Sequence, residues 1–335
     1  MTAPRLALAP VCAGGARRAV VFVGALLLAA CATLQSDRFV RAPFAGAVEL
    51  HDVAFFPQED YQCGPAALAT LLDHAGVRIT PAALTPQVYL PARRGSLQLE
   101  LLAAARRHGV VSYVLAPRLD ALLAEVQAGH PVVVLQNLAF AWYPRWHYAV
   151  VVGFDLARDE IVLRSGRERR RIVPLRVFER TWRRGDYWAM VALPPGVLPR
   201  TAEELPYLQA VIALERMQRW DEARRAYHAA LERWPASLGA QLGLGNAAYA
   251  LGDRAGAELA YRAAASRHPG AAIAFNNLAQ VLAELGRLAE AEEAIARALA
   301  LGGPHASVFR ETAAEIRSRR AGYTELSPAK QAEKK

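Results

Sequence analysis

Between residues 49 and 195, short apolar segments alternate with segments of helical periodicity. Segments of strand length that are rich in Val, Ile and Tyr lie at residues 110–116, 131–137, 147–154, 160–165 and 186–193. Segments with apolar residues at helical spacing lie at residues 64–74, 97–108 and 119–128. Because the helices come first and the strands follow at close spacing, the pattern predicts an α+β domain with a largely antiparallel sheet.

Beyond a Pro-rich stretch at residues 193–201, which is typical of a domain boundary, the pattern changes to a period of 34 residues. Positions of one kind recur together at this spacing: Ala223, Ala257 and Ala291; Tyr227, Tyr261 and Ile295; Ala230, Ala264 and Ala298; Pro235 and Pro269. The period and these positions resemble the tetratricopeptide repeat (TPR), a helix–turn–helix unit. The resemblance implies an all-α solenoid.

The repeat pattern also predicts how the solenoid turns and ends. Gly252 and Gly286 occupy the turn between the two helices of their repeats, where the first repeat has Gln218. We expect the TPR domain to cover residues 202–319, with a last helix at residues 307–319 that covers the terminal apolar face. The polar residues 320–335 are predicted to form a disordered tail.

The first thirty residues predict an export signal. Basic residues precede an apolar run, residues 19–30, that is too short to span a bilayer comfortably. Residues 28–31, Leu-Ala-Ala-Cys, resemble the lipobox of bacterial lipoproteins, which implies cleavage before Cys31 and acylation of this cysteine. We therefore predict a signal peptide over residues 1–30 and a lipidated tether over residues 31–48. An uncleaved or ordinarily cleaved signal is the alternative.

The lipobox resemblance also implies a location. Ala32, rather than Asp, follows the cysteine, which in Gram-negative lipoproteins favours sorting to the outer membrane. The expected location is therefore the bacterial cell envelope, as an outer-membrane lipoprotein that faces the periplasm.

Composition narrows the classes of protein. The chain has 335 residues, of which 53% are hydrophobic and 21% charged, as in globular proteins. Three cysteines exclude a disulfide-stapled scaffold or a Cys-rich zinc domain. The histidines show no metal-ligand spacing, so no metal and no cofactor are expected. The net charge of +9 suggests an acidic partner, but basic residues without interleaved aromatics on an exported protein argue against nucleic acid.

Cys63 is the candidate nucleophile. If the signal peptide is removed and Cys31 is acylated, Cys63 is the only free thiol of the exported chain, either buried and inert or kept for reactivity. Gly64-Pro65 and the Ala/Leu-rich run after it place Cys63 at the first turn of a helix. The positive end of a helix stabilises a thiolate, so this position favours a lowered cysteine pKa and a nucleophilic role.

A cysteine nucleophile needs a base and an oxyanion site. His147 opens a predicted strand and is expected at the rim of the sheet, where the first helix could bring Cys63. An imidazole there would form a thiolate–imidazolium pair and then protonate the leaving amine. Gln58, five residues before Cys63, can supply a side-chain amide donor for the oxyanion, beside the backbone N–H of Cys63.

Together these residues resemble a known family. Gln58, Cys63-Gly64-Pro65 and His147-Tyr148 with residues 150–153 are similar to the bacteriocin-processing cysteine peptidases, family 39 of the cysteine peptidases, and closest to a lipoprotein subgroup that joins such a domain to TPRs. The resemblance covers residues 49–193 and implies a papain-like fold, which we expect over residues 49–195. It also implies Cys63 as nucleophile, His147 as base and acid, and Gln58 as oxyanion donor. It does not extend to an exporter, so cleavage of double-glycine leader peptides is not carried over.

The chain departs from the family pattern at two positions. Relatives commonly have Gln six residues before Cys, whereas Gln58 is five before Cys63. Relatives have an Asp on the next strand that orients the histidine, and here Ser165 takes its place as a candidate third member of the site. Serine can accept a hydrogen bond but carries no charge to stabilise imidazolium. Asp155 and Asn137 are alternative orienting groups.

Other features leave their roles open. The basic run at residues 164–171 indicates either a solvated hairpin or a surface for an acidic peptide or lipopolysaccharide phosphate. Trp142, Tyr143 and Trp146 either line a substrate groove beside His147 or pack in a core or loop.

Three functions fit the sequence. The first is a lipid-anchored cysteine peptidase that hydrolyses peptide bonds and recruits a protein substrate or partner through its TPR domain. The second is a scaffold lipoprotein with a catalytically retired peptidase fold. The third is an amide-transfer or transpeptidation enzyme that uses the same Cys–His pair.

Overall fold

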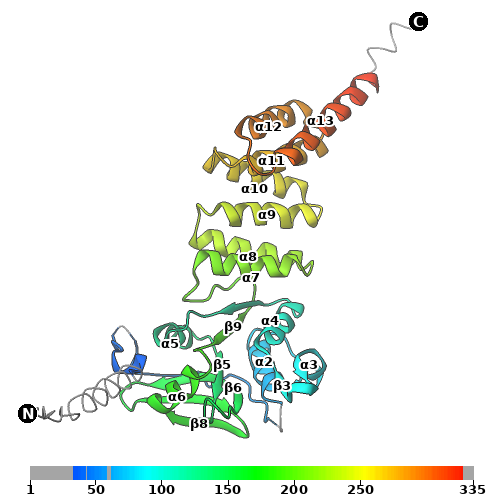
Figure 1. Cartoon of the computed structure of the whole chain (residues 1–335). Helices are drawn as coiled ribbons and strands as arrows, with labels where there is room; N and C mark the ends of the chain where they lie inside the picture. The colour runs from blue at the N-terminus through cyan, green and yellow to red at the C-terminus, as the bar shows by residue number, and fades with distance from the viewer. Residues whose placement is uncertain (1–32, 43, 59–61, 327–335) are drawn as a thin grey trace, which may run out of the picture.

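The computed structural model of the chain describes residues 33–42, 44–58 and 62–326. The predicted signal peptide, Cys31 and residues 327–335 lie outside these ranges. Figure 1 shows a sheet domain with helices packed against it, from which a stack of paired helices leads to the C-terminus.

The sheet domain is built on an antiparallel sheet with the strand order β4-β9-β5-β6-β7-β8, and β1 pairs with β6. Its strands are β1 (Ala47–Glu49), β4 (Val111–Val114), β5 (Val132–Asn137), β6 (Trp146–Asp155), β7 (Glu160–Ser165), β8 (Glu168–Pro174) and β9 (Ala189–Leu193). The helices around it are α2 (Cys63–His74), α3 (Pro81–Val88), α4 (Gln98–Arg107), α5 (Leu119–Gln127) and α6 (Leu175–Arg183). Two short strands, β2 (Tyr89–Leu90) and β3 (Gly95–Ser96), form a separate pair.

The predicted α+β class with an antiparallel sheet is confirmed. The pattern did not indicate α3, α6 or β8. Helix α3 begins at Pro81 and contains Pro86, so its sequence resembles a loop. Strand β8 is rich in arginine and largely exposed, so it lacks the apolar alternation of a half-buried strand.

Both faces of the sheet are covered, which explains the almost continuous apolar runs of β5 and β6. Alternate residues of β5 and β6 point to opposite faces. On one face, Val133 and Val150 pack with α2 and α4. On the other face, Val134 and Val151 pack with α5 and α6. The domain therefore has three layers, and α2 brings Cys63 to the sheet.

The prediction of a free tether at residues 31–48 is wrong for its described part, because that part is docked on the sheet domain. Leu34 is buried, and the backbone N–H groups of Gln35 and Ser36 donate to the Glu179 carboxylate at 2.5 and 2.9 Å. The side-chain carbonyl of Gln35 accepts from the backbone N–H of Leu119 at 2.7 Å. Apolar side chains and a carboxylate far along the chain thus hold a segment whose Pro and Gly content suggested a free linker.

The helical part consists of α7 (Glu204–Glu215), α8 (Trp220–Arg233), α9 (Leu238–Ala250), α10 (Arg254–Arg267), α11 (Ala272–Glu284), α12 (Leu288–Leu301) and α13 (Ala306–Leu326). These are three TPR pairs and a last helix, as predicted. The turn positions Gln218, Gly252 and Gly286 all have positive φ, of 57°, 80° and 77°. The prediction that a disordered tail begins at residue 320 is wrong, because α13 continues to Leu326.

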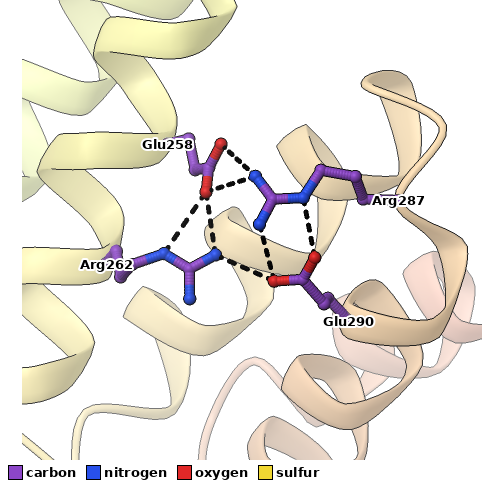
Figure 2. Close-up of polar contacts among 4 residues, drawn as sticks. All are labelled: Glu258, Arg262, Arg287 and Glu290. Carbon is purple, nitrogen blue, oxygen red and sulfur yellow. Dashed lines mark hydrogen bonds and ion pairs between the residues drawn. The ribbon is translucent and has the colours of Figure 1, made fainter.

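Adjacent repeats are also joined by ion pairs between α10 and α12. Figure 2 shows Arg262 and Arg287 each placed between the carboxylates of Glu258 and Glu290, at distances of 2.6 to 3.3 Å. These side chains are partly exposed, so a single pair contributes little to stability, although four groups share the network.

The TPR domain shares a hydrophobic core with the sheet domain. Helix α7 lies against β4, which is an edge strand of the sheet. The buried Glu125 carboxylate accepts from the backbone N–H groups of Arg200 and Thr201 at 3.0 and 2.7 Å. One buried cluster includes Tyr113 and Leu193 together with Tyr207, Leu208, Val211 and Leu214. The Pro-rich connection is therefore fixed to both domains.

Candidate active site

Cys63 is the first residue of α2, which packs on β6 beside the strand start that carries His147. The helix begins one residue earlier than predicted, so Pro65 is its third residue. Pro is tolerated there, because backbone N–H groups of the first turn have no partner within the helix. A Cβ at Gly64 would lie 2.3 Å from the Ser96 hydroxyl oxygen, so the close approach of β3 requires glycine next to Cys63.

The thiol lies at the edge of the core. Backbone N–H groups of Tyr148, Gly64 and Cys63 itself interact with the sulfur and favour the thiolate. Burial acts in the opposite direction and dominates, so the pKa of the Cys63 thiol is raised. The sequence indicated a lowered pKa from the helix terminus alone. It could not show how far the sulfur is removed from water.

His147 is the second residue of β6, and its Nε2 lies 2.9 Å from the hydroxyl oxygen of Ser165 on β7. The structure therefore brings His147 together with Ser165, the candidate third member of the site. This hydrogen bond uses Nε2, so Nδ1 is the ring nitrogen that remains for another partner. Within the part of the chain that the structure describes, the ring hydrogen-bonds Ser165 and not Cys63.

The surroundings of His147 keep its ring neutral. Burial, with smaller contributions from Arg171 and Arg145, lowers the pKa of His147 to about 4. Ser165 is itself buried and supplies no negative charge. Because a hydroxyl both donates and accepts, Ser165 also does not enforce one imidazole tautomer as a carboxylate would. At neutral pH the Cys63 thiol is therefore protonated and the His147 imidazole is neutral, in place of the ion pair that the sequence indicated.

Gln58 and Cys63 both contact the backbone of Tyr148 on β6. The Gln58 amide nitrogen donates to the Tyr148 carbonyl oxygen at 3.5 Å, and the Tyr148 N–H faces the Cys63 sulfur. Gln58 is further fixed by two hydrogen bonds with Gly166: its N–H donates to the carbonyl oxygen, and its side-chain oxygen accepts from the Gly166 N–H, at 2.9 and 3.1 Å. The Gln58 amide is thus held at Tyr148, whose backbone also contacts the thiol.

The sequence missed two contributors to this arrangement. Tyr148 serves through its backbone, which composition and spacing cannot reveal. Both interpretations of the basic run, a solvated hairpin or a surface for an acidic ligand, expect an exposed Arg164, but this residue is buried, and its guanidinium donates to the carbonyl oxygens of Leu50 and Val53 at 3.3 and 3.5 Å. It therefore fastens the segment that leads to Gln58 against β7. Residues 167–171 of the basic run are exposed, which agrees both with a solvated hairpin and with a surface for an acidic ligand.

Neither alternative orienting group reaches His147. The Asn137 side-chain oxygen accepts from the backbone N–H groups of Ala139 and Arg145 at 3.0 and 2.9 Å, so this residue organises its own loop. Asp155 lies at the opposite end of β6 and binds the backbone of the next turn. Both suggestions are wrong, and Ser165 is the group at the imidazole.

The loop between β5 and β6 exposes its aromatic side chains. Trp142 is 82% exposed and stacks on Phe140 with ring centroids 5.6 Å apart. Tyr143 and Trp146 are also exposed, at 70% and 53%. Core packing is excluded for Trp142, Tyr143 and Trp146, whereas the contacts of Trp142 with Phe140 and Tyr143 are packing within the loop. Within the described ranges, no group of three or more His, Cys, Asp or Glu residues could hold a metal ion.

We predict that alkylation of Cys63 by iodoacetamide accelerates toward alkaline pH. A thiol with a raised pKa is protonated at pH 6–8, and each pH unit then changes the thiolate fraction about tenfold. No imidazolium is present to hold the thiolate at lower pH, because the pKa of His147 is about 4. The measurement is the labelling rate between pH 5 and pH 9, with the urea-unfolded chain as control. A constant rate between pH 5 and pH 7 would instead indicate a resting ion pair.

Comparison with known families agrees with the two parts of this structure. Residues 50–189 match the Peptidase_C39 like family, and residues 208–265 and 242–306 match the tetratricopeptide repeat. The chain thus carries a C39-like peptidase domain followed by TPR repeats. No curated protein sequence matches the chain.

Three solved structures illustrate the likeness. A protein of Bacillus anthracis described as a C39-like peptidase is 18% identical with a TM-score of 0.39, and the match covers 44% of this chain and 98% of that one. The peptidase domain of Streptococcus ComA, a bifunctional ABC transporter of a quorum-sensing pathway, is 20% identical with a TM-score of 0.35, over 42% and 98% of the two chains. The type III secretion translocator chaperone SycD of Yersinia enterocolitica is 18% identical with a TM-score of 0.34, over 35% and 83%.

Proposed function

We propose that this protein is a lipid-anchored cysteine peptidase of the bacterial cell envelope, facing the periplasm, which hydrolyses peptide bonds with Cys63 as nucleophile. The observation that carries the proposal is the convergence of three groups on the start of β6. The Cys63 sulfur and the Gln58 amide both contact the Tyr148 backbone, and His147, the preceding residue, is bound to Ser165.

The neutral resting pair defines the first step. His147 Nδ1 takes the proton of the Cys63 thiol as the sulfur attacks the scissile carbonyl carbon, and Nε2–H donates to Ser165. The Gln58 amide and the Cys63 backbone N–H hold the oxyanion. The imidazolium then protonates the leaving amine as the C–N bond breaks. Water, activated by the neutral imidazole, finally hydrolyses the acyl-enzyme and restores the thiol.

The exposed aromatic loop supports a substrate with apolar side chains next to the cleaved bond. Trp146 immediately precedes His147 in β6, and Trp142 and Tyr143 are exposed in the loop before it. The TPR domain adds a surface for a protein substrate or partner.

Membrane attachment in this proposal rests on the lipobox. No helix in the described part of the chain is long and apolar enough to cross a bilayer. Docking begins at Leu34, only three residues after Cys31. An acylated Cys31 would therefore hold the peptidase domain close to the membrane surface, with little reach.

A retired peptidase fold is the second candidate, because Ser165 replaces a carboxylate and both members of the Cys–His pair are neutral at rest. In that case Cys63→Ala and His147→Ala should leave partner binding and cellular phenotype unchanged.

A peptide library tests the two candidates. The purified mature chain is incubated with the library, and products are identified by mass spectrometry, with and without an amine acceptor to reveal amide transfer. We expect defined cleavages that Cys63→Ala abolishes. Cleavage that persists in Cys63→Ala, or no product over the range pH 6–9, would contradict the peptidase proposal.

A further inference from the structure

We propose that a pocket between the TPR helices binds a protein segment through one cationic side chain, Lys or Arg. This inference deepens the proposed role of the TPR domain in protein binding. The pocket, of about 320 Å³, is formed mainly by α9 and α11, and α7, α8 and α10 each contribute one residue. Its volume is in the range of ligand sites, which are about 300–1,000 Å³. Its walls include Glu215, Trp220, Asn246, Tyr249, Tyr261 and Asn277.

Glu215 supplies an unused acceptor. It is the last residue of α7, and its Oε1 is buried without a hydrogen-bond partner in the described structure. The Tyr227 hydroxyl interacts with the carboxyl group, but burial prevails and raises the pKa of Glu215. A buried, incompletely paired carboxylate costs free energy. A cationic side chain in the pocket would satisfy it.

The other walls suit the same occupant. Trp220 and Tyr261 present aromatic rings, which attract a guanidinium or ammonium group and pack on its aliphatic stem. Tyr261 donates to the Asn246 side-chain oxygen at 2.8 Å, which directs this amide into a fixed orientation. Asn246 and Asn277 can therefore hydrogen-bond the backbone of the bound segment, while the carboxylate selects its charge.

The pocket does not favour an acidic segment. Its lining contains no Lys or Arg among the residues described. Arg254 adjoins it, with its guanidinium 3.9 Å from the Tyr249 ring centroid, but this cation is paired with Glu284 at 2.5 Å. The Tyr249 hydroxyl also binds the Glu284 carboxylate. Glu215 is therefore the charged group of the lining without such a partner.

The test is selection of 12-residue peptides from a random phage-displayed library on the purified full-length mature chain. We expect the selected peptides to share a Lys or Arg at one position, and Glu215→Gln to weaken their binding at least tenfold. Changing that Lys or Arg to norleucine should have a similar effect. Because Glu215→Gln removes a costly buried charge, its Tm should equal or exceed that of the wild type, which separates lost binding from lost folding.

Glu232→Gln is the matched control, because Glu232 is exposed on α8 away from the lining and should leave the affinity unchanged. Peptides that share Asp, Glu or a free carboxyl terminus, an affinity that Glu215→Gln does not change, or no selected peptide would each overturn the inference. Cys63→Ala should bind the peptides as the wild type does. Cleavage and pocket binding can thus fail independently.

Discussion

Replacing His147 by Ala is expected to slow the reaction of Cys63 with a peptidyl acyloxymethyl ketone about 10²- to 10⁴-fold, the usual contribution of general acid–base catalysis. The effect is large because the Cys63 thiol is protonated at rest, so the attack depends on a base that removes its proton. The measurement is the second-order rate constant at pH 7.5 with purified variants, together with hydrolysis of any peptide that the wild type cleaves.

His51→Ala provides the control. His51 lies near Cys63 in sequence, but its side chain is 79% exposed, and its Nδ1 lies 3.8 Å from Oε1 of Glu49. Its substitution should leave the rate within about twofold, as expected for an exposed position away from the site. Equal rates for wild type and His147→Ala would mean that the imidazole does not act on the thiol, and the retired-scaffold candidate would then be preferred.

The substitution Ser165→Asp is expected to raise the rate at which Cys63 reacts with the peptidyl acyloxymethyl ketone at pH 6 by about tenfold or more. A carboxylate in hydrogen-bonding contact with Nε2 favours the imidazolium, and an adjacent opposite charge shifts a pKa by about 1–3 pH units. Arg145 and Arg171, which now lower the pKa of His147, would help to stabilise the new carboxylate. The pKa of the His147 ring can be followed directly by NMR titration in Ser165→Asp.

Ser165→Asn separates charge from shape, because Asn has nearly the same size as Asp and still offers a hydrogen-bond acceptor. It should leave the pKa of His147 near its present value and give no acceleration at pH 6. If Ser165→Asp and Ser165→Asn behave alike, while both retain the wild-type Tm, the missing carboxylate is not what limits this site.

The parts of the structure that follow from local physics could be predicted from the sequence. The 34-residue period places each TPR helix, because small and aromatic residues must recur wherever paired helices touch. Cys63 at the start of a helix follows from Gly64-Pro65 and the apolar run after them. The antiparallel sheet follows from closely spaced strands, although the order of those strands does not.

What the sequence could not supply depends on contacts between distant segments. The docking of residues 33–37 depends on Glu179, more than 140 positions away. In the sequence, nothing distinguishes the buried Arg164 from its exposed Arg neighbours. Only the folded chain brings the carbonyl oxygens of Leu50 and Val53 to its guanidinium. The direction of the Cys63 pKa was predicted from the helix terminus alone, and only the surrounding core shows that burial outweighs it.

The core that α7 shares with β4 fixes how far the TPR pocket stands from the thiol. A flexible linker would let a captured protein offer any of its peptide bonds to Cys63. With a fixed spacing, the cleaved peptide bond would lie at a set distance along the substrate from the residue bound in the TPR pocket. Selectivity would then depend on the number of residues between anchor and cleavage point as well as on the sequence at the cut.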